Sequence, residues 1–292
     1  MLSTKASNRA FQVGNGIFLL LVFLVAVYPF LYVVAVSLSD PYAVMQNKVF
    51  LLPVGFSFSS YKTVLSNPSI WSGYKNTLLY TGVGTLMNLF FTSTMAYALS
   101  KRQLFGRRVF SLMVIFTMFF QGGMIPMYIL VCNLRLINTL WAVILPTVIS
   151  TWNLMVMRTF FESLPSELED AAMVDGCNPL AVFARIILPL SSPIMLTMAL
   201  FYAVGHWNSY FAPFIYLNDR AKYPLQITVK QIVISGETSF ANYTNVLDQE
   251  EVIIATTVKY ATIVVSILPI VTLYPFMQKY FVKGVMIGSV KG

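Results

Sequence analysis

Long apolar segments recur along the chain and limit what it can fold into. Each has about 20 residues, the length that an α-helix needs to cross a bilayer, and they lie near residues 17–38, 77–99, 109–131, 140–157, 190–211 and 252–276. Of the 292 residues, 57% are apolar and only 10% are charged, too few polar residues for the surface of a soluble protein. We therefore predict an all-α, polytopic membrane protein with six transmembrane helices in a single domain, residues 1–292.

The charge and the reactive residues exclude several classes of protein. The net charge of +8 could indicate nucleic-acid binding, but the basic residues form neither a stripe nor a tail. They gather in short runs between apolar segments, as the positive-inside rule predicts. Cys132, Cys177 and the single histidine, His206, support neither a disulfide framework nor a multi-histidine metal site. We expect no nucleic-acid partner and no bound metal.

Lysine and arginine residues also predict the orientation in the membrane. The loop "KRQLFGRR", residues 101–108, carries four of them, and both termini carry more. In a six-helix protein these three regions face the same side, which predicts that both termini are cytoplasmic. The loop at residues 158–185 then also faces the cytoplasm. The long loops at residues 39–76 and 217–251 face outward.

One cytoplasmic segment, "LEDAAMVDGCNPLAVFARIILP" at residues 168–189, is unusually acidic for this chain. Five acidic residues lie near it, at positions 162, 167, 169, 170 and 175. Pro165 is expected in the opening turn of a first short helix, and Gly176 follows the end of that helix. Asn178 is the expected N-cap of a second helix that begins at Pro179. The segment therefore predicts an elbow of two helices outside the membrane.

The residues of this elbow leave two interpretations open. Leu180, Phe183 and Ile187 recur on one face of the second helix, which is typical of an amphipathic surface loop whose acids cap the helices. Alternatively, the first helix is a docking helix. In that case the adjacent Ala171 and Ala172 let another protein approach closely, and the acids bond to its basic groups.

The elbow resembles the EAA motif of permease subunits of bacterial ABC importers. That motif reads E-A-A-x-x-x-G and is followed, nine residues later, by I-x-L-P. Asp170-Ala171-Ala172, Gly176 and the "IILP" at residues 186–189 match it, with aspartate in place of glutamate. Four further segments are similar to the carbohydrate-type permeases that resemble the second maltose permease subunit. They are "AYALSKRQLFGRR" (96–108), "IPMYILVCNLRLINTLWAVILP" (125–146), "WNSYFAPF" (207–214) and "GVMIGSVKG" (284–292).

This resemblance implies a mechanism of coupling. In the family the elbow is seated on a cytoplasmic ATPase, whose ATP-driven closure moves the membrane helices from inward-open to outward-open. The implied coupling loop is residues 162–189, and its implied contact residues are Glu169, Asp170, Ala171, Ala172, Gly176, Leu188 and Pro189. The C-terminal residues Val290, Lys291 and Gly292 are implied to reach the ATPase as well, although a frayed chain end is the alternative.

The resemblance also implies a set of partners. The chain has no G-x-x-x-x-G-K-[ST] loop, so we expect it to be no enzyme and to bind no cofactor. ATP and Mg belong on a partner ATPase dimer. A second permease subunit would complete a heterodimer in the bacterial inner membrane, and an extracytoplasmic solute-binding protein would deliver the ligand. The implied substrates are oligosaccharides or polysaccharide fragments, alginate-like polyuronates among them.

Polar residues in the predicted spans are candidates for the substrate path, because burying them in lipid is costly. These candidates are Asn88, Gln121, Asn153, His206, Trp207, Asn208 and Tyr210. Aromatic faces and amide groups suit sugar rings. Gln121 precedes Gly122 and Gly123, where we expect a break in the helix. The alternative is that these residues only form interhelical hydrogen bonds and interfacial anchors.

Two other classes of membrane protein are disfavoured. An ion-coupled secondary transporter would need acidic residues within its spans, and apart from their ends the predicted spans contain none. A membrane-embedded enzyme would need a nucleophile–base pair or a metal cluster, and the single histidine argues against both. We therefore expect the permease subunit of an ATP-driven importer.

Overall fold

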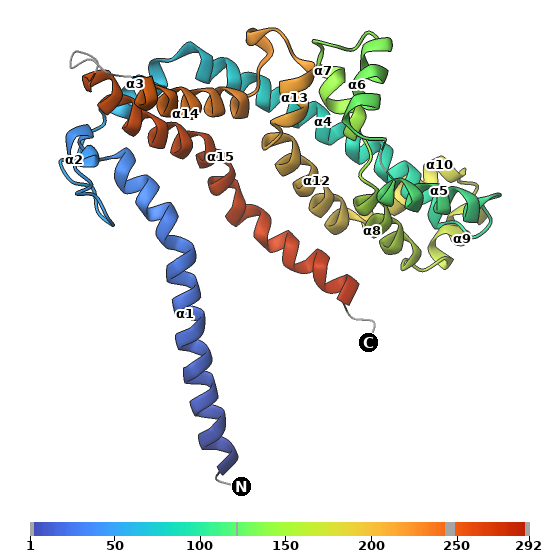
Figure 1. Cartoon of the computed structure of the whole chain (residues 1–292). Helices are drawn as coiled ribbons and strands as arrows, with labels where there is room; N and C mark the ends of the chain where they lie inside the picture. The colour runs from blue at the N-terminus through green and yellow to red at the C-terminus, as the bar shows by residue number, and fades with distance from the viewer. Residues whose placement is uncertain (1–2, 121, 243–248, 290–292) are drawn as a thin grey trace. The chain divides into compact units, whose positions relative to one another are not determined.

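The computed structural model of the chain describes residues 3–120, 122–242 and 249–289, and the regular elements in these residues are all helical. In chain order (Figure 1) they are α1 (Ser3–Ser37), α2 (Pro41–Met45), α3 (Ser59–Ser66), α4 (Pro68–Ser100), α5 (Arg107–Phe119), α6 (Met124–Asn133), α7 (Leu140–Ile144), η1 (Leu145–Thr147), α8 (Thr151–Glu162), α9 (Glu167–Val174), α10 (Pro179–Val182), η2 (Phe183–Ile187), α11 (Leu188–Leu190), α12 (Ser192–Trp207), α13 (Phe211–Tyr216), η3 (Arg220–Lys222), α14 (Leu225–Asn242) and α15 (Gln249–Ser289). The all-α prediction is confirmed.

Three of the predicted spans correspond to long helices. The segment Phe11–Ser37 of α1 and the segment Ala255–Pro275 of α15 are each long and apolar enough to cross a membrane. α4 has 33 residues, which corresponds to roughly 50 Å of helix. Its middle is less apolar than the other two, because threonine, asparagine and glycine residues interrupt the run.

The other three predicted spans are not continuous helices: the break in the span 109–131 was predicted beside Gln121, whereas those at the spans 140–157 and 190–211 correct the prediction. In the predicted span 109–131, α5 ends at Phe119 and a separate helix, α6, begins at Met124. Gly123 between them adopts φ 85°, in the left-handed region. The second bends by 53° between residues 147 and 151, just after Pro146, which cannot donate a backbone hydrogen bond. The third begins only after an 81° bend at residue 191 and ends at Trp207.

The number of spans follows from how these bent pairs are counted. If each bent pair is one span, the described residues contain up to five helical segments that could cross a membrane by length and composition. α4 is not among these five, so the count of six remains a prediction.

The chain packs into two compact units, and the first consists of Met1–Ile70 and Val229–Leu268. Its segment after α1 is folded by backbone hydrogen bonds, from Asp40 N–H to the Val54 carbonyl (2.9 Å) and from Ser57 N–H to the Leu38 carbonyl (2.9 Å). The Asp40 carboxylate also caps α2 by accepting hydrogen bonds from its first turn. The second unit consists of Trp71–Thr228 and Pro269–Gly292. The single permease domain stays a prediction.

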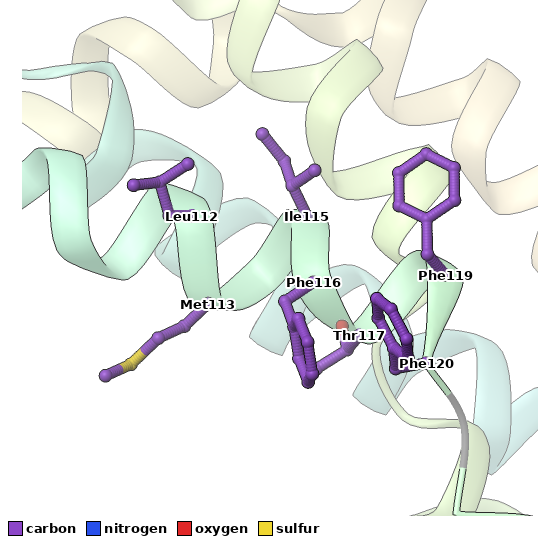
Figure 2. A pocket seen from close by; sticks show the side chains of 7 residues that line it. All are labelled: Leu112, Met113, Ile115, Phe116, Thr117, Phe119 and Phe120. Carbon is purple, nitrogen blue, oxygen red and sulfur yellow. The ribbon is translucent and has the colours of Figure 1, made fainter.

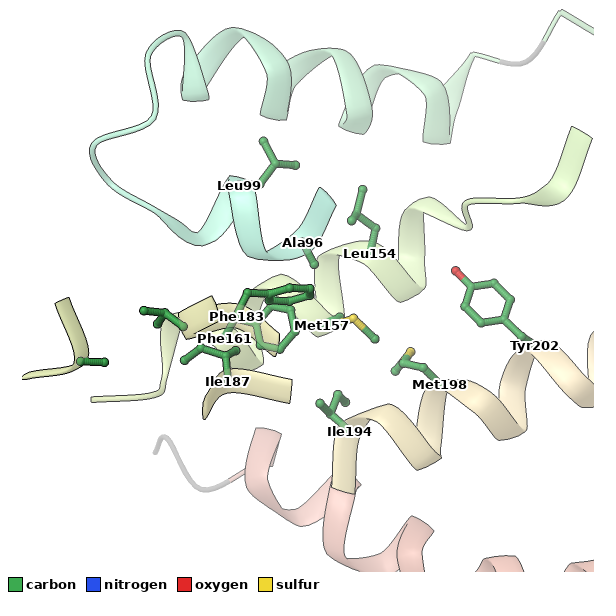
Figure 3. Packing of buried hydrophobic residues seen from close by; sticks show 12 residues of the cluster. Ala96, Leu99, Leu154, Met157, Phe161, Phe183, Ile187, Ile194, Met198 and Tyr202 are labelled. Atoms are coloured by element: carbon green, nitrogen blue, oxygen red, sulfur yellow. The ribbon is translucent and has the colours of Figure 1, made fainter. Parts of the chain in front are cut away.

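The second unit contains a hydrophobic core formed by the ends of several helices. Figure 3 shows its side chains, which come from α4, α8, α9, α10, η2 and α12 and are Ala96, Leu99, Leu154, Met157, Phe161, Ala172, Val182, Phe183, Ile187, Ile194, Met198 and Tyr202. Residues of the predicted coupling loop therefore belong to the same core as residues of the predicted spans. A displacement of the loop must move this core or disrupt it.

Candidate functional site

The first helix of the elbow, α9, ends as the sequence predicts. Glu167, Glu169 and Asp170 lie in its first turn, where the helix dipole favours acids. Gly176 adopts φ 86° beyond its end. The Gly176 N–H donates to the Met173 carbonyl and the Cys177 N–H to the Ala172 carbonyl, both at 3.0 Å. This pair of bonds is the Schellman motif, which requires a left-handed residue that is usually glycine.

The second helix of the elbow begins as predicted. Asn178 is its N-cap and accepts a hydrogen bond of 2.8 Å from the Ala181 N–H, and Pro179 is its first residue. Two details of the prediction are wrong. Pro165 precedes α9 instead of lying in its first turn. Leu180 is 79% exposed and does not join Phe183 and Ile187 in the core.

α9 has one face turned toward its own subunit and one turned away from it. Ala172 is 6% exposed and belongs to the hydrophobic core. Glu169 lies one turn earlier on the same face, and its side chain is 13% exposed. Asp170 and Ala171 are exposed, and Val174 is 88% exposed. The residues of the EAA motif are therefore divided between the two faces.

The inward face of α9 is bonded to the end of α4. The Glu169 carboxylate forms an ion pair with the Lys101 ammonium group and accepts a hydrogen bond of 3.4 Å from the Tyr97 hydroxyl. The Lys101 nitrogen also lies 4.2 Å from the centre of the Tyr97 ring, within the range of a cation–π interaction. Three side chains thus connect the elbow to α4.

A second charged cluster joins α5 to α8 beside the elbow. Glu162, the last residue of α8, forms ion pairs with Arg107 and with Arg158, the latter at 2.9 Å. The Arg107 guanidinium also donates to the Leu99 carbonyl at 2.8 Å, and that of Arg158 donates to the Ser111 hydroxyl at 3.0 Å. The cations of the two clusters come from different elements. Lys101 follows the end of α4, Arg107 begins α5, and Arg158 lies in α8.

The two remaining elbow residues of the predicted coupling set lie where the elbow meets α12. Leu188 is partly buried against the hydrophobic core, and Pro189 is exposed. Both belong to α11, directly before the 81° bend that leads into α12. Their position is that of a joint between the elbow and the next helix.

His206, a candidate for the substrate path, is hydrogen-bonded inside the protein. Its Nε2 lies 2.6 Å from the Asn88 Oδ1. The Asn88 amide group donates to the carbonyls of Thr147 and Val148, both at 2.8 Å, so Oδ1 is its acceptor and Nε2 of His206 carries the proton. Asn88 therefore satisfies two carbonyls that the break between η1 and α8 leaves without helical partners.

The other candidates of the substrate path are spread over α8 and the end of α12. Asn153 on α8 is 7% exposed. Trp207 packs against Tyr74 with ring centres 6.3 Å apart, and its buried indole N–H has no hydrogen-bond partner among the described residues. Asn208 donates to the Val204 carbonyl at 3.0 Å, and Tyr210 stacks on Phe214 at 5.4 Å.

Four predicted site residues cannot be placed. Gln121, Val290, Lys291 and Gly292 lie outside the described residues. The structure does confirm the break that was predicted beside Gln121, because α5 ends at Phe119 and α6 begins at Met124.

An open hollow of about 690 Å³ runs along α5. Figure 2 shows its lining, which is Leu112, Met113, Ile115, Phe116, Thr117, Phe119 and Phe120. Its one hydroxyl, on Thr117, bonds to the Val114 carbonyl of the same helix at 2.7 Å. A lining without free polar groups suits lipid chains or another apolar helix and does not suit a sugar.

Sequence reasoning missed the residues that bind the elbow, whereas Asn88, which bonds at the helix break, was a candidate for the substrate path. Lys101 and Arg107 entered the sequence analysis only as markers of orientation, and Tyr97 was not singled out. The signal was present, because one cytoplasmic loop is basic and the next is acidic, and opposite charges on one side of a membrane tend to pair. Within the described residues, no three His, Cys, Asp or Glu side chains gather to bind a metal.

Comparison with known proteins identifies relatives that match nearly the whole chain. Residues 3–287 match the family described as "Binding-protein-dependent transport system inner membrane component". The chain is 45% identical to Protein LplC of Bacillus subtilis over 100% of its own length and 98% of that protein. It is 41% identical to the polygalacturonan/rhamnogalacturonan transport system permease protein YtcP of Bacillus subtilis, over 98% of this chain and 99% of that one.

A solved structure agrees with these relatives. It is a crystal structure of a bacterial ABC transporter involved in the import of the acidic polysaccharide alginate, and one of its chains superposes with a TM-score of 0.86. That chain is 36% identical, with 94% of this chain and 98% of the other covered. The protein is therefore a member of the family of binding-protein-dependent transport system inner membrane components.

Proposed function

We propose that this chain imports oligosaccharides or polysaccharide fragments as one permease subunit of an ATP-driven transporter, and that α9 is the helix on which the ATPase acts. The observation that carries the proposal is the elbow. It is a helix ended by a Schellman motif at Gly176, and it presents Asp170 and Val174 on its outward face. It lies at the position of the EAA motif in a chain of an importer permease family.

The outward surface of the elbow has the composition of a protein-binding surface. Large apolar side chains are exposed on it beside acidic ones: Leu168, Met173, Val174 and Leu180. An apolar centre with a charged rim is typical of protein interfaces. The Schellman motif and the Asn178 cap hold this surface in one conformation, so little ordering entropy is lost when a partner binds.

The charged clusters support a cytoplasmic location for the elbow. The same location for both termini rests on the basic residues near them and on the proposed six-helix topology. Lys101 and Arg107, from the most basic loop, are bonded to Glu169 and Glu162 of the coupling loop. The two loops thus lie on one side of the membrane, and the positive-inside rule assigns that side to the cytoplasm. The C-terminal residues Val290, Lys291 and Gly292 are proposed as a further ATPase contact.

The proposed assembly follows from the family. A second permease subunit completes the pathway in the inner membrane, a cytoplasmic ATPase dimer binds ATP and Mg, and an extracytoplasmic solute-binding protein delivers the ligand. The chain itself acts as a permease and binds no cofactor.

For the substrate we propose an acidic glycan fragment. One relative is named for polygalacturonan and rhamnogalacturonan, and the similar solved transporter for alginate. Among the path candidates, Trp207 is best supported, because its buried indole N–H has no partner among the described side chains and could donate to a sugar hydroxyl. Asn153, Tyr210 and Gln121 remain candidates. His206 and Asn208 already form hydrogen bonds within the protein, which favours a packing role for both.

Reconstitution tests the proposal. The chain would be co-expressed with its partner permease, ATPase and solute-binding protein and placed in liposomes. Uptake of labelled oligogalacturonate, alginate oligosaccharides and a neutral maltodextrin would then be measured with and without ATP. We expect ATP-dependent uptake of at least one acidic oligosaccharide, unaffected by a proton ionophore. Uptake that proceeds without ATP and stops with the ionophore would show an ion-coupled transporter instead.

A further inference from the structure

We propose that Lys101 and Glu169 form a strut that transmits the displacement of α9 to α4, which makes Glu169 a positioning residue instead of a contact to the ATPase. The inference rests on the proposed function and adds the path by which the ATPase stroke enters the membrane helices. It concerns three side chains that contact one another: Glu169, Lys101 and Tyr97.

The first argument is the direction of the Glu169 side chain. It is 13% exposed and bonded to Lys101 and Tyr97, whereas the neighbouring Asp170 is exposed. A carboxylate that is already paired and largely shielded from water would lose those bonds to reach a partner protein. Asp170 can bind a basic group of the ATPase without such a loss.

The second argument is what the pair connects. Lys101 directly follows the last residue of α4, a helix of 33 residues. Tyr97 lies one turn earlier, and its ring and hydroxyl hold both charges in place. Because a helix is stiff along its axis, a force applied at Lys101 acts on the whole of α4. Ala172 packs in the core beside the pair and gives α9 a second, apolar contact with the same unit.

The third argument is the chemistry of the connection. An ion pair supported by a hydrogen bond and a cation–π contact resists both separation and sliding of its partners, because each displacement weakens more than one interaction. An apolar contact alone would let α9 slide over α4. The pair is therefore suited to carry force in the direction of the membrane helices.

The test uses the reconstituted four-component transporter and measures uptake per ATP hydrolysed, normalised to the inserted chain. Lys101→Gln and Glu169→Gln each break the strut, and we expect ATP hydrolysis to continue while uptake per ATP falls by roughly fivefold or more, the range of a lost coupling between two sites. Arg102→Gln is the matched control, because Arg102 is an exposed neighbour with no ion pair among the described residues. It should transport like the wild type.

Charge reversal distinguishes a strut from an ATPase contact. Lys101→Glu and Glu169→Lys should each uncouple the transporter, and the double variant should recover most of the uptake because it restores an opposite-charge pair. Glu169→Asp, which keeps the charge and is expected to fold, should give intermediate coupling. Wild-type uptake by single variants, or a double variant as poor as either single one, would overturn the strut. Uptake by the unmodified protein in the absence of ATP would instead refute the proposed function.

Discussion

α4 is bonded to its neighbours in two regions that differ in chemistry. Between Thr77 and Thr92 the bonds are neutral: Asn88 bonds to two carbonyls and to His206, and Thr92 to the Tyr202 hydroxyl at 2.7 Å. Between Tyr97 and Lys101 the bonds are charged. The second region lies next to a cytoplasmic loop that is predicted to meet water, whereas Asn88 and Thr92 bond to residues of other predicted spans.

This difference reflects the solvent of each region. Unpaired charges are costly within a bilayer, whereas amides and hydroxyls that are fully paired are tolerated there and fix two helices together. Near the cytoplasm an ion pair can form, and it can also be broken and remade. We therefore infer that the middle of α4, at Asn88 and Thr92, stays fixed against α8 and α12, and we call it the fixed bearing. The end of α4 is then the part through which movement enters. The predictions below test each half of this contrast.

The largest effect is expected from Asn88→Leu. The substitution leaves the carbonyls of Thr147 and Val148 and the N–H of His206 unpaired, and we expect it to lower the free energy of unfolding by about 2–4 kcal/mol. Thr94→Val is the control, because the Thr94 hydroxyl is exposed and bonds only within its own helix. Unfolding in detergent, followed by circular dichroism, measures both. Equal midpoints for the two variants would show that the middle of α4 is no fixed bearing.

The next largest effect tests the close packing of α4 and α12. A Cβ added at Gly84 would lie 2.5 Å from Nε2 of His206, whereas one added at Gly82 meets no atom within 4 Å. We expect Gly84→Ala to cost about 1–3 kcal/mol of unfolding free energy, because the imidazole is held by Asn88 and cannot easily move. Gly82→Ala on the same helix should be nearly neutral. The same unfolding measurement compares them, and two neutral variants would contradict this packing.

Gly176→Leu tests the elbow. Gly176 adopts φ 86° and a Cβ there meets no atom within 4 Å, so the cost comes from the backbone and not from a clash. We expect a local cost of about 1–2 kcal/mol and the loss of uptake, with the protein still inserted and the fixed bearing intact. Gly176→Asn is the control, because asparagine tolerates this conformation. Full uptake by the leucine variant, with the ATPase still bound, would refute the role of the elbow.

The smallest effect is expected from Tyr97→Phe. It removes the 3.4 Å hydrogen bond to Glu169 and keeps the aromatic ring under Lys101. The loss of stability should be below about 1 kcal/mol, with a modest fall in uptake per ATP. A loss of uptake as large as that of Glu169→Gln would mean that the hydroxyl, and not the ion pair, carries the connection.

The sequence predicted the helical class and the local structure of the elbow because both depend on neighbouring residues. Apolar runs, the glycine after α9 and the Asn178-Pro179 start of α10 act within a few positions of the chain. Of the breaks in three spans, the one beside Gln121 was predicted, and the other two were not. Their stability depends on residues far away in sequence, such as Asn88, which bonds to the carbonyls of Thr147 and Val148.

The direction in which each side chain of the EAA motif points could not be predicted from the sequence either. Glu169 and Asp170 are adjacent acids of the same charge, and the packing of Ala172 in the core turns the face of Glu169 toward Lys101. Because such contacts are not visible in the sequence, Lys101 was interpreted there as a marker of orientation and not as a partner of the elbow. The contacts of Glu169 with Lys101 and Tyr97 in the folded chain identify that partner.

The central claim is that the outward face of α9 meets the ATPase while its inward face holds the membrane helices. Single cysteines at Asp170 and at Ala172, in a chain with Cys132 and Cys177 replaced by serine, test it through a photoactivatable cross-linker in the assembled transporter. We predict that Asp170→Cys joins the ATPase in an ATP-dependent manner and that Ala172→Cys, at a position 6% exposed, does not. Equal cross-linking at both positions, or none at Asp170→Cys in a transporter that remains active, would contradict the account.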